Sequence, residues 1–163
     1  MVSDPKDPSD PMVPPFGADH DPEAFPDRRH VLLVSSDPDQ LDMYALAFRL
    51  AGVAVAGTTS HDEAIRLVRD GAVSAVVVDV VNERDWQTCE DLVTLSGGKL
   101  PVTVLTGWLS SDSTYLDRAF RIGCAAYLAK PTLPETLQQI VERTRAGERR
   151  IAVLGTGPEI GPS

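Results

Sequence analysis

An aspartate, a threonine and a lysine each stand at the end of a short apolar run in this sequence. Asp79 closes one run, Thr106 closes the next, and Lys130 follows the last. Taken singly, they have ordinary explanations: a loop cap, a strand residue and a lysine that reaches solvent. Burying a carboxylate is costly without partners, however, and an ammonium and a hydroxyl are suitable partners. The three groups also suit acyl-phosphate chemistry, because a carboxylate can attack phosphorus while the other two hold the phosphoryl oxygens.

The stretches around these residues predict strands that alternate with helices. Apolar runs indicate strands at 31–34, 53–56, 73–79, 102–106 and 125–129. Helices are expected from a cap at Asp37 or Asp39 to about residue 51, from a cap at Ser60 to Gly71, and over 86–95, 111–122 and 133–145.

Strands joined through helices run parallel and carry helices on both faces of the sheet. We therefore expect an α/β protein with a flavodoxin-like (βα)5 fold, a doubly wound five-stranded parallel sheet in three αβα layers. Ligands of such sheets bind at the carboxyl ends of the strands. The aspartate, the threonine and the lysine all fall at that edge of the predicted sheet.

The segments that contain these residues resemble the receiver domain of two-component response regulators. The resemblance spans about residues 30–145 and is carried by VLLVSSDPDQLDMYALAFRLAG, SAVVVD, PVTVLTG and AAYLAKP. It implies roles for five positions: the phosphoacceptor Asp79, the switch hydroxyl Thr106, the phosphate-binding Lys130, the aromatic switch residue Tyr127, and Pro131, which would follow a cis peptide bond.

The residues after the first strand depart from this family. Receivers usually have two adjacent acids there, which hold Mg²⁺, whereas this chain has Ser35 and Ser36, with Asp37 one place further on. Mg²⁺ prefers oxygen ligands that include carboxylates. We therefore expect a degenerate metal site that binds no metal, or binds Mg²⁺ weakly through Asp37 and Asp79, and no other cofactor. Lys130 would then neutralise Asp79 directly, and phosphorylation of Asp79 would be impaired.

Two surfaces are candidates for partner binding. The first predicted helix is apolar at most positions, which indicates either a wide core stripe or an exposed docking patch. In the resembled family this helix docks on a histidine kinase or phosphotransfer protein. The family's output face, formed by the fourth helix, fifth strand and fifth helix, would bind a downstream effector or a second copy in a homodimer. The candidate contact residues are Leu41, Tyr44 and Phe48 in the first helix, and Tyr115, Arg118 and Gln139 on the output face.

Composition limits the other functions that the chain could have. A formal net charge of −9 and a pI near 4.7 argue against a nucleic-acid partner. No apolar stretch is long enough for a membrane helix, and no signal peptide is evident. Cys89 and Cys124 lack metal-ligand spacing and indicate a reducing compartment, so we expect a cytoplasmic protein without a membrane partner.

The chain divides into three predicted parts. Residues 1–29 are rich in proline and aspartate, which predicts a disordered extension; residues 30–146 form the receiver-like domain; and residues 147–163 are expected to be a flexible tail.

The function that follows is that of an atypical stand-alone receiver, not an enzyme, which takes part in a phosphorelay through protein–protein contacts. One alternative is a conventional phosphoryl-accepting receiver whose metal site is completed by Asp37 or by a partner. Another is a small flavodoxin-like protein that binds a flavin or nucleotide. That protein would need a glycine-rich loop after the first strand, and residues 35–38 contain no glycine.

Overall fold

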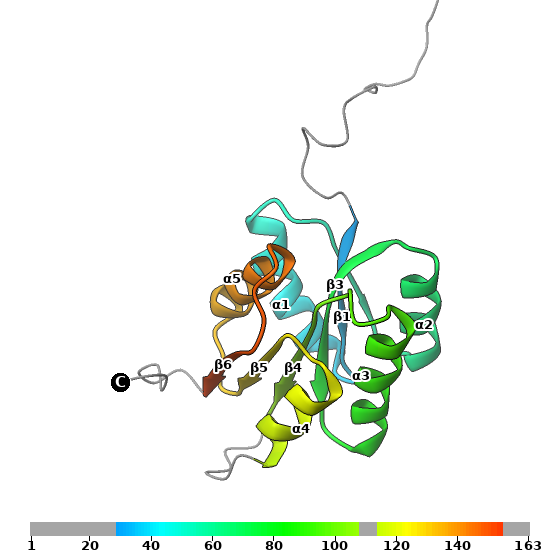
Figure 1. The fold of residues 1–163 in the computed structure, drawn as a ribbon. Coiled ribbons are helices and arrows are strands. Elements are labelled where there is room, and N and C mark those ends of the chain that lie inside the picture. Colours follow the sequence, from blue (N-terminus) through cyan, green and yellow to red (C-terminus); the bar gives the residue numbers. More distant parts are fainter. Residues whose placement is uncertain (1–28, 108–113, 155–163) are drawn as a thin grey trace, which may run out of the picture.

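A computed structural model describes residues 29–107 and 114–154 (Figure 1). The expected disorder of the N-terminal extension, the start of the fourth helix and the end of the tail fall outside these residues. Within the described residues the strands are β1 His30–Val34, β2 Val55–Thr58, β3 Val73–Val80, β4 Val102–Thr106, β5 Ala126–Ala129 and β6 Ile151–Leu154. The helices are α1 Pro38–Leu50, α2 His61–Arg69, α3 Glu83–Leu95, α4 Thr114–Ile122 and α5 Pro134–Arg145.

The strands form one parallel sheet in the order β2-β1-β3-β4-β5-β6. The predicted α/β class and flavodoxin-like arrangement are therefore confirmed, with one more strand than the five expected. Helices α1 and α5 cover one face of the sheet, and α2, α3 and α4 cover the other (Figure 1). Two apolar layers fill the spaces between sheet and helices, because side chains on each strand alternate between the two faces.

Strand β3 lies in the middle of the sheet and is buried along its whole length. Val76 and Val78 pack toward α2, α3 and α4, whereas Ala75 and Val77 pack toward α1 and α5. Asp79 continues the second set and is the first charged residue on that face of the strand. The alternation therefore turns this carboxylate toward the side of the sheet that α1 covers.

The prediction of a flexible tail over 147–163 is wrong for Ile151–Leu154, which form β6. The chain turns after α5 through Gly147 and Arg150, which have φ values of 111° and 63°. It then pairs with β5 over four residues, from Ala126 with Ile151 to Ala129 with Leu154. Ile151 and Val153 pack against the apolar layer under α1 and α5, which gives this short strand its hydrophobic stabilisation.

Two predicted elements begin at other residues than expected, for local reasons. Strand β2 begins two residues later than expected, because the amide of Val53 still donates to the carbonyl of Phe48 in the turn that ends α1, where Gly52 has a φ of 78°. Helix α3 begins three residues earlier than expected, because Asn82 and Asp85 form a reciprocal capping box. Among the described residues, no helix combines the length and the apolar character that crossing a bilayer requires.

Candidate functional site

The four polar strand-end positions singled out in the sequence lie at one edge of the sheet. Ser35 follows β1, Asp79 is the penultimate residue of β3, Thr106 ends β4 and Lys130 follows β5. These strands are neighbours in the sheet and run in the same direction, so their carboxyl ends lie side by side. The parallel topology therefore gathers groups that are up to 95 residues apart in the chain, as 130 − 35 gives.

The carboxylate of Asp79 is at the centre of this group and is only 5% exposed. Its Oδ1 atom lies 2.9 Å from Nζ of Lys130. Its Oδ2 atom accepts hydrogen bonds from the hydroxyl of Ser35 at 2.9 Å and from the side-chain amide of Gln40 at 2.7 Å. A buried carboxylate needs such partners, and hydrogen bonds to a charged group contribute about 1.5–3 kcal/mol each.

Lys130 holds its ammonium beside Asp79 from the end of β5. Its backbone amide donates to the carbonyl of Thr106 at 2.7 Å, which fixes where the side chain begins. The Lys130–Pro131 peptide bond is cis, as the resemblance implied. No donor in the described part of the chain is aligned for a hydrogen bond to Oδ1 of Asp79, so the contact with Lys130 is an ion pair.

The residues expected to form a degenerate metal site have other structural roles. Ser35 is buried; it donates to Asp79 and accepts from the backbone amide of Asp37 at 3.1 Å. The carboxylate of Asp37 is the N-cap of α1 and accepts from the amides of Asp39 and Gln40. Ser36 is exposed. Asp37 was the nearest replacement for the missing acids, but its carboxylate already caps the N-terminus of α1.

The groups at this edge do not fit Mg²⁺. The ion prefers several oxygen ligands with carboxylates among them. Asp79 offers one carboxylate, and its Oδ2 atom already accepts two hydrogen bonds. Within residues 29–107 and 114–154, no three His, Cys, Asp or Glu side chains are grouped so that they could hold a metal ion. These donors suit a carboxylate neutralised by the protein itself.

Gln40 is the site residue that the sequence analysis missed. It lies in the first turn of α1, whose start is held beside the site by the Asp37 cap. Its amide nitrogen is 2.7 Å from Asp79 and 3.4 Å from the hydroxyl of Ser35. Its position in the sequence was the signal that could have found it. The helix that follows the first strand of such a sheet begins where that strand ends, so residues in its first turn lie close to the site.

Thr106 and Tyr127 are buried close to this edge. Thr106 pairs with Val80 in β3 and with Ala129 in β5, one position beyond the pair formed by Asp79 and Leu105. Tyr127 belongs to the apolar layer under α2, α3 and α4, so its ring faces inward. The structure thus brings both residues to the neighbouring strands, on the sheet face opposite to the one that Asp79 continues.

The expected docking role of Tyr44 and Phe48 is wrong, because both side chains belong to the core under α1. Phe48 is 0% exposed, and Leu41 packs against the same layer. Tyr44 donates from its hydroxyl to the carbonyl of Thr132 at 3.3 Å. Burial raises the pKa of Tyr44, and the negative charge of Asp79 raises this pKa further. The exposed apolar residues of α1 are Met43, Leu46 and Leu50.

The candidate residues of the output face are arranged differently from the expectation. The ring of Tyr115 stacks on Trp86 of α3, with centroids 6.0 Å apart. Arg118 lies over the same indole at 4.7 Å and bonds Glu83 at 2.6 and 2.7 Å. Both residues thus link α4 to α3, while Gln139 is exposed on α5. Strand β5 offers no free edge here, because β6 pairs with it.

Comparisons with known proteins agree with this architecture. A family model described as the response regulator receiver domain matches residues 31–142. A CheY-like response regulator receiver domain protein from Methanospirillum hungatei has a TM-score of 0.64 and 18% identity, over 74% of this chain and 95% of that chain. A response regulator from Thermotoga maritima has a TM-score of 0.64 and 19% identity, over 72% and 98% of the two chains. No curated protein matches the chain.

Proposed function

Because this chain belongs to the response regulator receiver domain family of two-component signalling, we propose that it is an atypical receiver that signals by binding other proteins. In this proposal Asp79 is the potential phosphoacceptor, and its phosphorylation by the usual metal-dependent route is impaired. The domain is a signalling module, not an enzyme. It works in the cytoplasm, where its two buried free cysteines, Cys89 and Cys124, stay reduced.

The observation that carries the proposal is the set of donors around Asp79. Lys130 supplies a positive charge at 2.9 Å, and Ser35 and Gln40 supply two hydrogen bonds to the other oxygen. Two unit charges about 4 Å apart attract each other by about 4 kcal/mol at an effective dielectric constant of 20, before the cost of desolvation is subtracted. The carboxylate is therefore stabilised without a divalent ion, and the resting state of the site needs no ligand.

The same contacts oppose phosphorylation. A carboxylate oxygen attacks phosphorus through a lone pair; Oδ2 of Asp79 already accepts two hydrogen bonds, and Oδ1 is held in the ion pair with Lys130. The incoming phosphoryl group also brings negative charge toward a negative nucleophile. In the described part of the chain, Lys130 is the cation that pairs with Asp79. One cation positions a phosphate, but it provides less transition-state stabilisation than a lysine acting with a metal ion.

Partner binding is assigned to the exposed apolar face of α1. Met43, Leu46 and Leu50 are 47%, 54% and 78% exposed and follow the spacing i, i+3, i+7, so they share one side of the helix. This face replaces Tyr44 and Phe48 as the proposed contact with a histidine kinase or phosphotransfer protein. A downstream effector, or a second copy of the chain, would meet α4 and α5 around β6, with Gln139 exposed there.

The decisive test is incubation with a small-molecule phosphodonor and Mg²⁺, followed by intact-mass measurement. We expect little or no phosphorylated species from the wild type, and none from Asp79→Asn. The variant Ser35→Asp with Ser36→Asp restores the acidic pair of the family and should gain a phosphorylated species that depends on Mg²⁺. Rapid, Mg²⁺-dependent phosphorylation of the wild type at Asp79 would contradict the proposal.

A conventional receiver is the second candidate, favoured by the position of Asp79 beside Lys130. It would bind Mg²⁺, and we would follow that binding through Trp86, a buried residue in the first turns of α3. The titration uses a Trp108→Phe background, which leaves Trp86 as the single tryptophan of the two, with and without beryllofluoride. A saturable fluorescence change would support the conventional receiver, and the atypical receiver predicts no change.

A further inference from the structure

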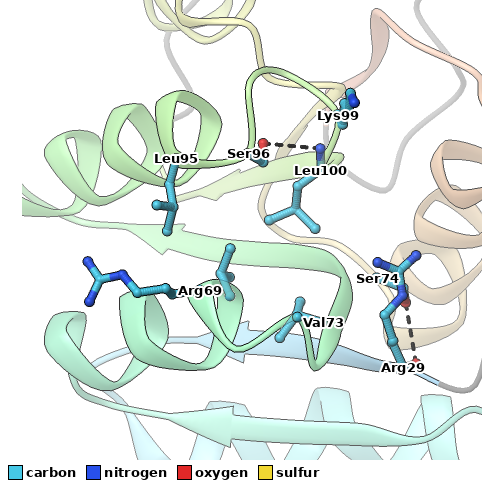
Figure 2. A pocket seen from close by; sticks show the side chains of 10 residues that line it. Arg29, Arg69, Val73, Ser74, Leu95, Ser96, Lys99 and Leu100 are labelled. Carbon is cyan, nitrogen blue, oxygen red and sulfur yellow. Dashed lines mark hydrogen bonds between the residues drawn. The ribbon is translucent and has the colours of Figure 1, made fainter.

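A second polar region lies at the amino-terminal ends of the strands, which is the opposite end of the sheet from Asp79. Two adjoining cavities of about 450 and 530 Å³ share Arg29, Ser74 and Lys99 in their walls. These residues precede or begin β1, β3 and β4, so the cavities follow the amino-terminal ends of the strands. Figure 2 shows the first cavity, with Arg29, Arg69 and Lys99 placed around Val73 and Leu100.

The lining of these cavities is strongly basic for an acidic protein. We call the combined feature the basic groove, whose charged residues are the cations Arg29, Arg69, Lys99, Arg145 and Arg149 and the acid Glu142. The formal charge of the lining is +4, from five cations and one acid, whereas the whole chain carries −9. Such a concentration of one sign attracts an anionic ligand.

Part of this positive charge has a structural role. Arg145 pairs with Glu142 at 2.7 Å, and Arg149 donates to the carbonyls of Thr144 and Glu148 near the end of α5. Cations near helix C-termini also offset the partial negative charge of the terminal carbonyls. Within the described ranges, however, Arg69 and Lys99 form no ion pair with an acid. Their charges therefore remain available to a ligand.

We propose that the basic groove binds the acidic N-terminal segment of the same chain, residues 1–28. This segment contains seven acids, with Lys6 and Arg28 as its basic residues, which gives a formal charge of −5. It joins the domain at Arg29, which itself lines the groove. The acids from Asp19 to Asp27 lie within ten residues of Arg29, and an extended chain spans about 3.4 Å per residue.

The covalent link makes a weak contact sufficient. A segment tethered by a short linker has an effective concentration in the millimolar range, so each ion pair can be weak. The attraction also depends on ionic strength, because the Debye length falls from about 10 Å at 0.1 M salt to about 3 Å at 1 M salt. This interaction is independent of the proposed function, since it involves the edge of the sheet opposite to Asp79.

Paramagnetic relaxation in the full-length protein tests the proposal. A thiol-reactive spin label should attach selectively to the new cysteine of Ser9→Cys, because Cys89 and Cys124 are buried. We expect amide signals of Ser74, Ser96 and Leu100 at the groove to lose most of their intensity, and signals at the Asp79 edge to keep theirs. High salt should restore the groove signals.

Charge reversal provides the matched comparison. Arg69→Glu with Lys99→Glu should abolish the loss of intensity at the groove. Arg49→Glu should leave the loss unchanged, because Arg49 is also in the last turn of a helix but does not line the groove. Equal broadening at both edges of the sheet, or broadening that survives the double reversal, would overturn the proposal. Arg69→Gln with Lys99→Gln repeats the test if the reversal variant does not fold.

Discussion

At the scale of single residues, the contacts of Asp79 divide unequally between the two members of its ion pair. Asp79 is buried, whereas the side chain of Lys130 is 25% exposed and can turn toward water. Ser35 and Gln40 hydrogen-bond only one of the two carboxylate oxygens, so the other depends on the ammonium. Removing the cation therefore harms the fold more than removing the anion.

This asymmetry predicts that Lys130→Met costs more stability than Asp79→Asn. Lys130→Met leaves a buried carboxylate without its counter-charge and should lower the free energy of unfolding by about 3 kcal/mol. Asp79→Asn keeps an acceptor oxygen for Ser35 and Gln40 and should cost about 1 kcal/mol or less. Urea unfolding followed by circular dichroism measures both. The double variant should be more stable than Lys130→Met alone; if it is less stable, the buried charge is not the cause.

The raised pKa of Tyr44 predicts a loss of stability at alkaline pH. Burial and the nearby Asp79 keep Tyr44 protonated in the folded state, whereas an unfolded tyrosine ionises at a pKa of about 10. The stabilising contribution is thus complete below pH ~10 and is lost as the pH rises from there through the folded-state pKa. Tyr44→Phe should lack this part of the loss. The comparison is the difference in unfolding free energy between wild type and variant as the pH is raised, and a constant difference would contradict the prediction.

The sequence predicted the residues at the strand ends but not the residue that approaches them from a helix. Asp79 and Lys130 follow from strand direction, because parallel strands end at one edge. Gln40 depends on the orientation of the first turn of α1 and on the Asp37 cap, which no periodicity specifies. Tyr44 and Phe48 were open to both a core and a surface role, and only packing against α5 and the sheet decided it.

At the scale of secondary-structure elements, the central strands were predicted closely, whereas the edge strand β2 was predicted two residues too early and the edge strand β6 was missed. Strands β1, β3 and β4 are covered by helices on both faces, so most of their residues are apolar and the sequence shows each of them as a largely apolar run. Strand β2 was displaced by the turn that ends α1, in which Val53 takes part. Strand β6 has four residues, and its pairing with β5 depends on tertiary contacts of Ile151 and Val153, so its short run alone did not distinguish it from a tail.

Strand β4 contains Thr103, whose buried hydroxyl lowers the stability of the fold. Thr103 is 1% exposed, and its hydroxyl has no hydrogen-bond partner in the described part of the structure. Thr103→Val keeps the shape and removes the unsatisfied group, so it should raise the free energy of unfolding by about 1 kcal/mol. The matched control is Thr132→Val, which loses a hydrogen bond from the hydroxyl to the carbonyl of Ala129 at 2.8 Å. The control should lose about 1 kcal/mol; the same sign for both variants would contradict the prediction.

At the scale of the whole molecule, β6 covers the edge that β5 would otherwise present. An uncovered strand exposes unpaired backbone donors and acceptors and invites pairing with another chain. The run Ala126–Ala129 of β5 is apolar, so its exposure would promote self-association. The sixth strand thus changes what the face formed by α4, β5 and α5 can offer to a partner.

Detaching β6 should therefore increase self-association. Ile151→Asp with Val153→Asp removes the two contacts with the apolar layer and should cost roughly 2 kcal/mol of stability. Leu154→Asp is the control, because its side chain is 38% exposed and should tolerate a charge. Sedimentation velocity over a range of concentrations should detect stronger association of the double variant than of the wild type or the control. Unchanged sedimentation in a folded double variant would show that β6 does not protect this edge.

The parallel direction of β6 has a practical consequence for handling the protein. The strand ends at Leu154, on the side of the sheet where Asp79 and Lys130 lie, whereas Arg29 enters at the far side, about one strand length or 17–20 Å away. A fluorophore or fusion partner attached beyond Leu154 starts at the same end of the sheet as Asp79. It can therefore report on phosphorylation of Asp79 or obstruct access to it. Attaching the protein to a sensor surface through its N-terminal side leaves Asp79 and Lys130 facing the solution.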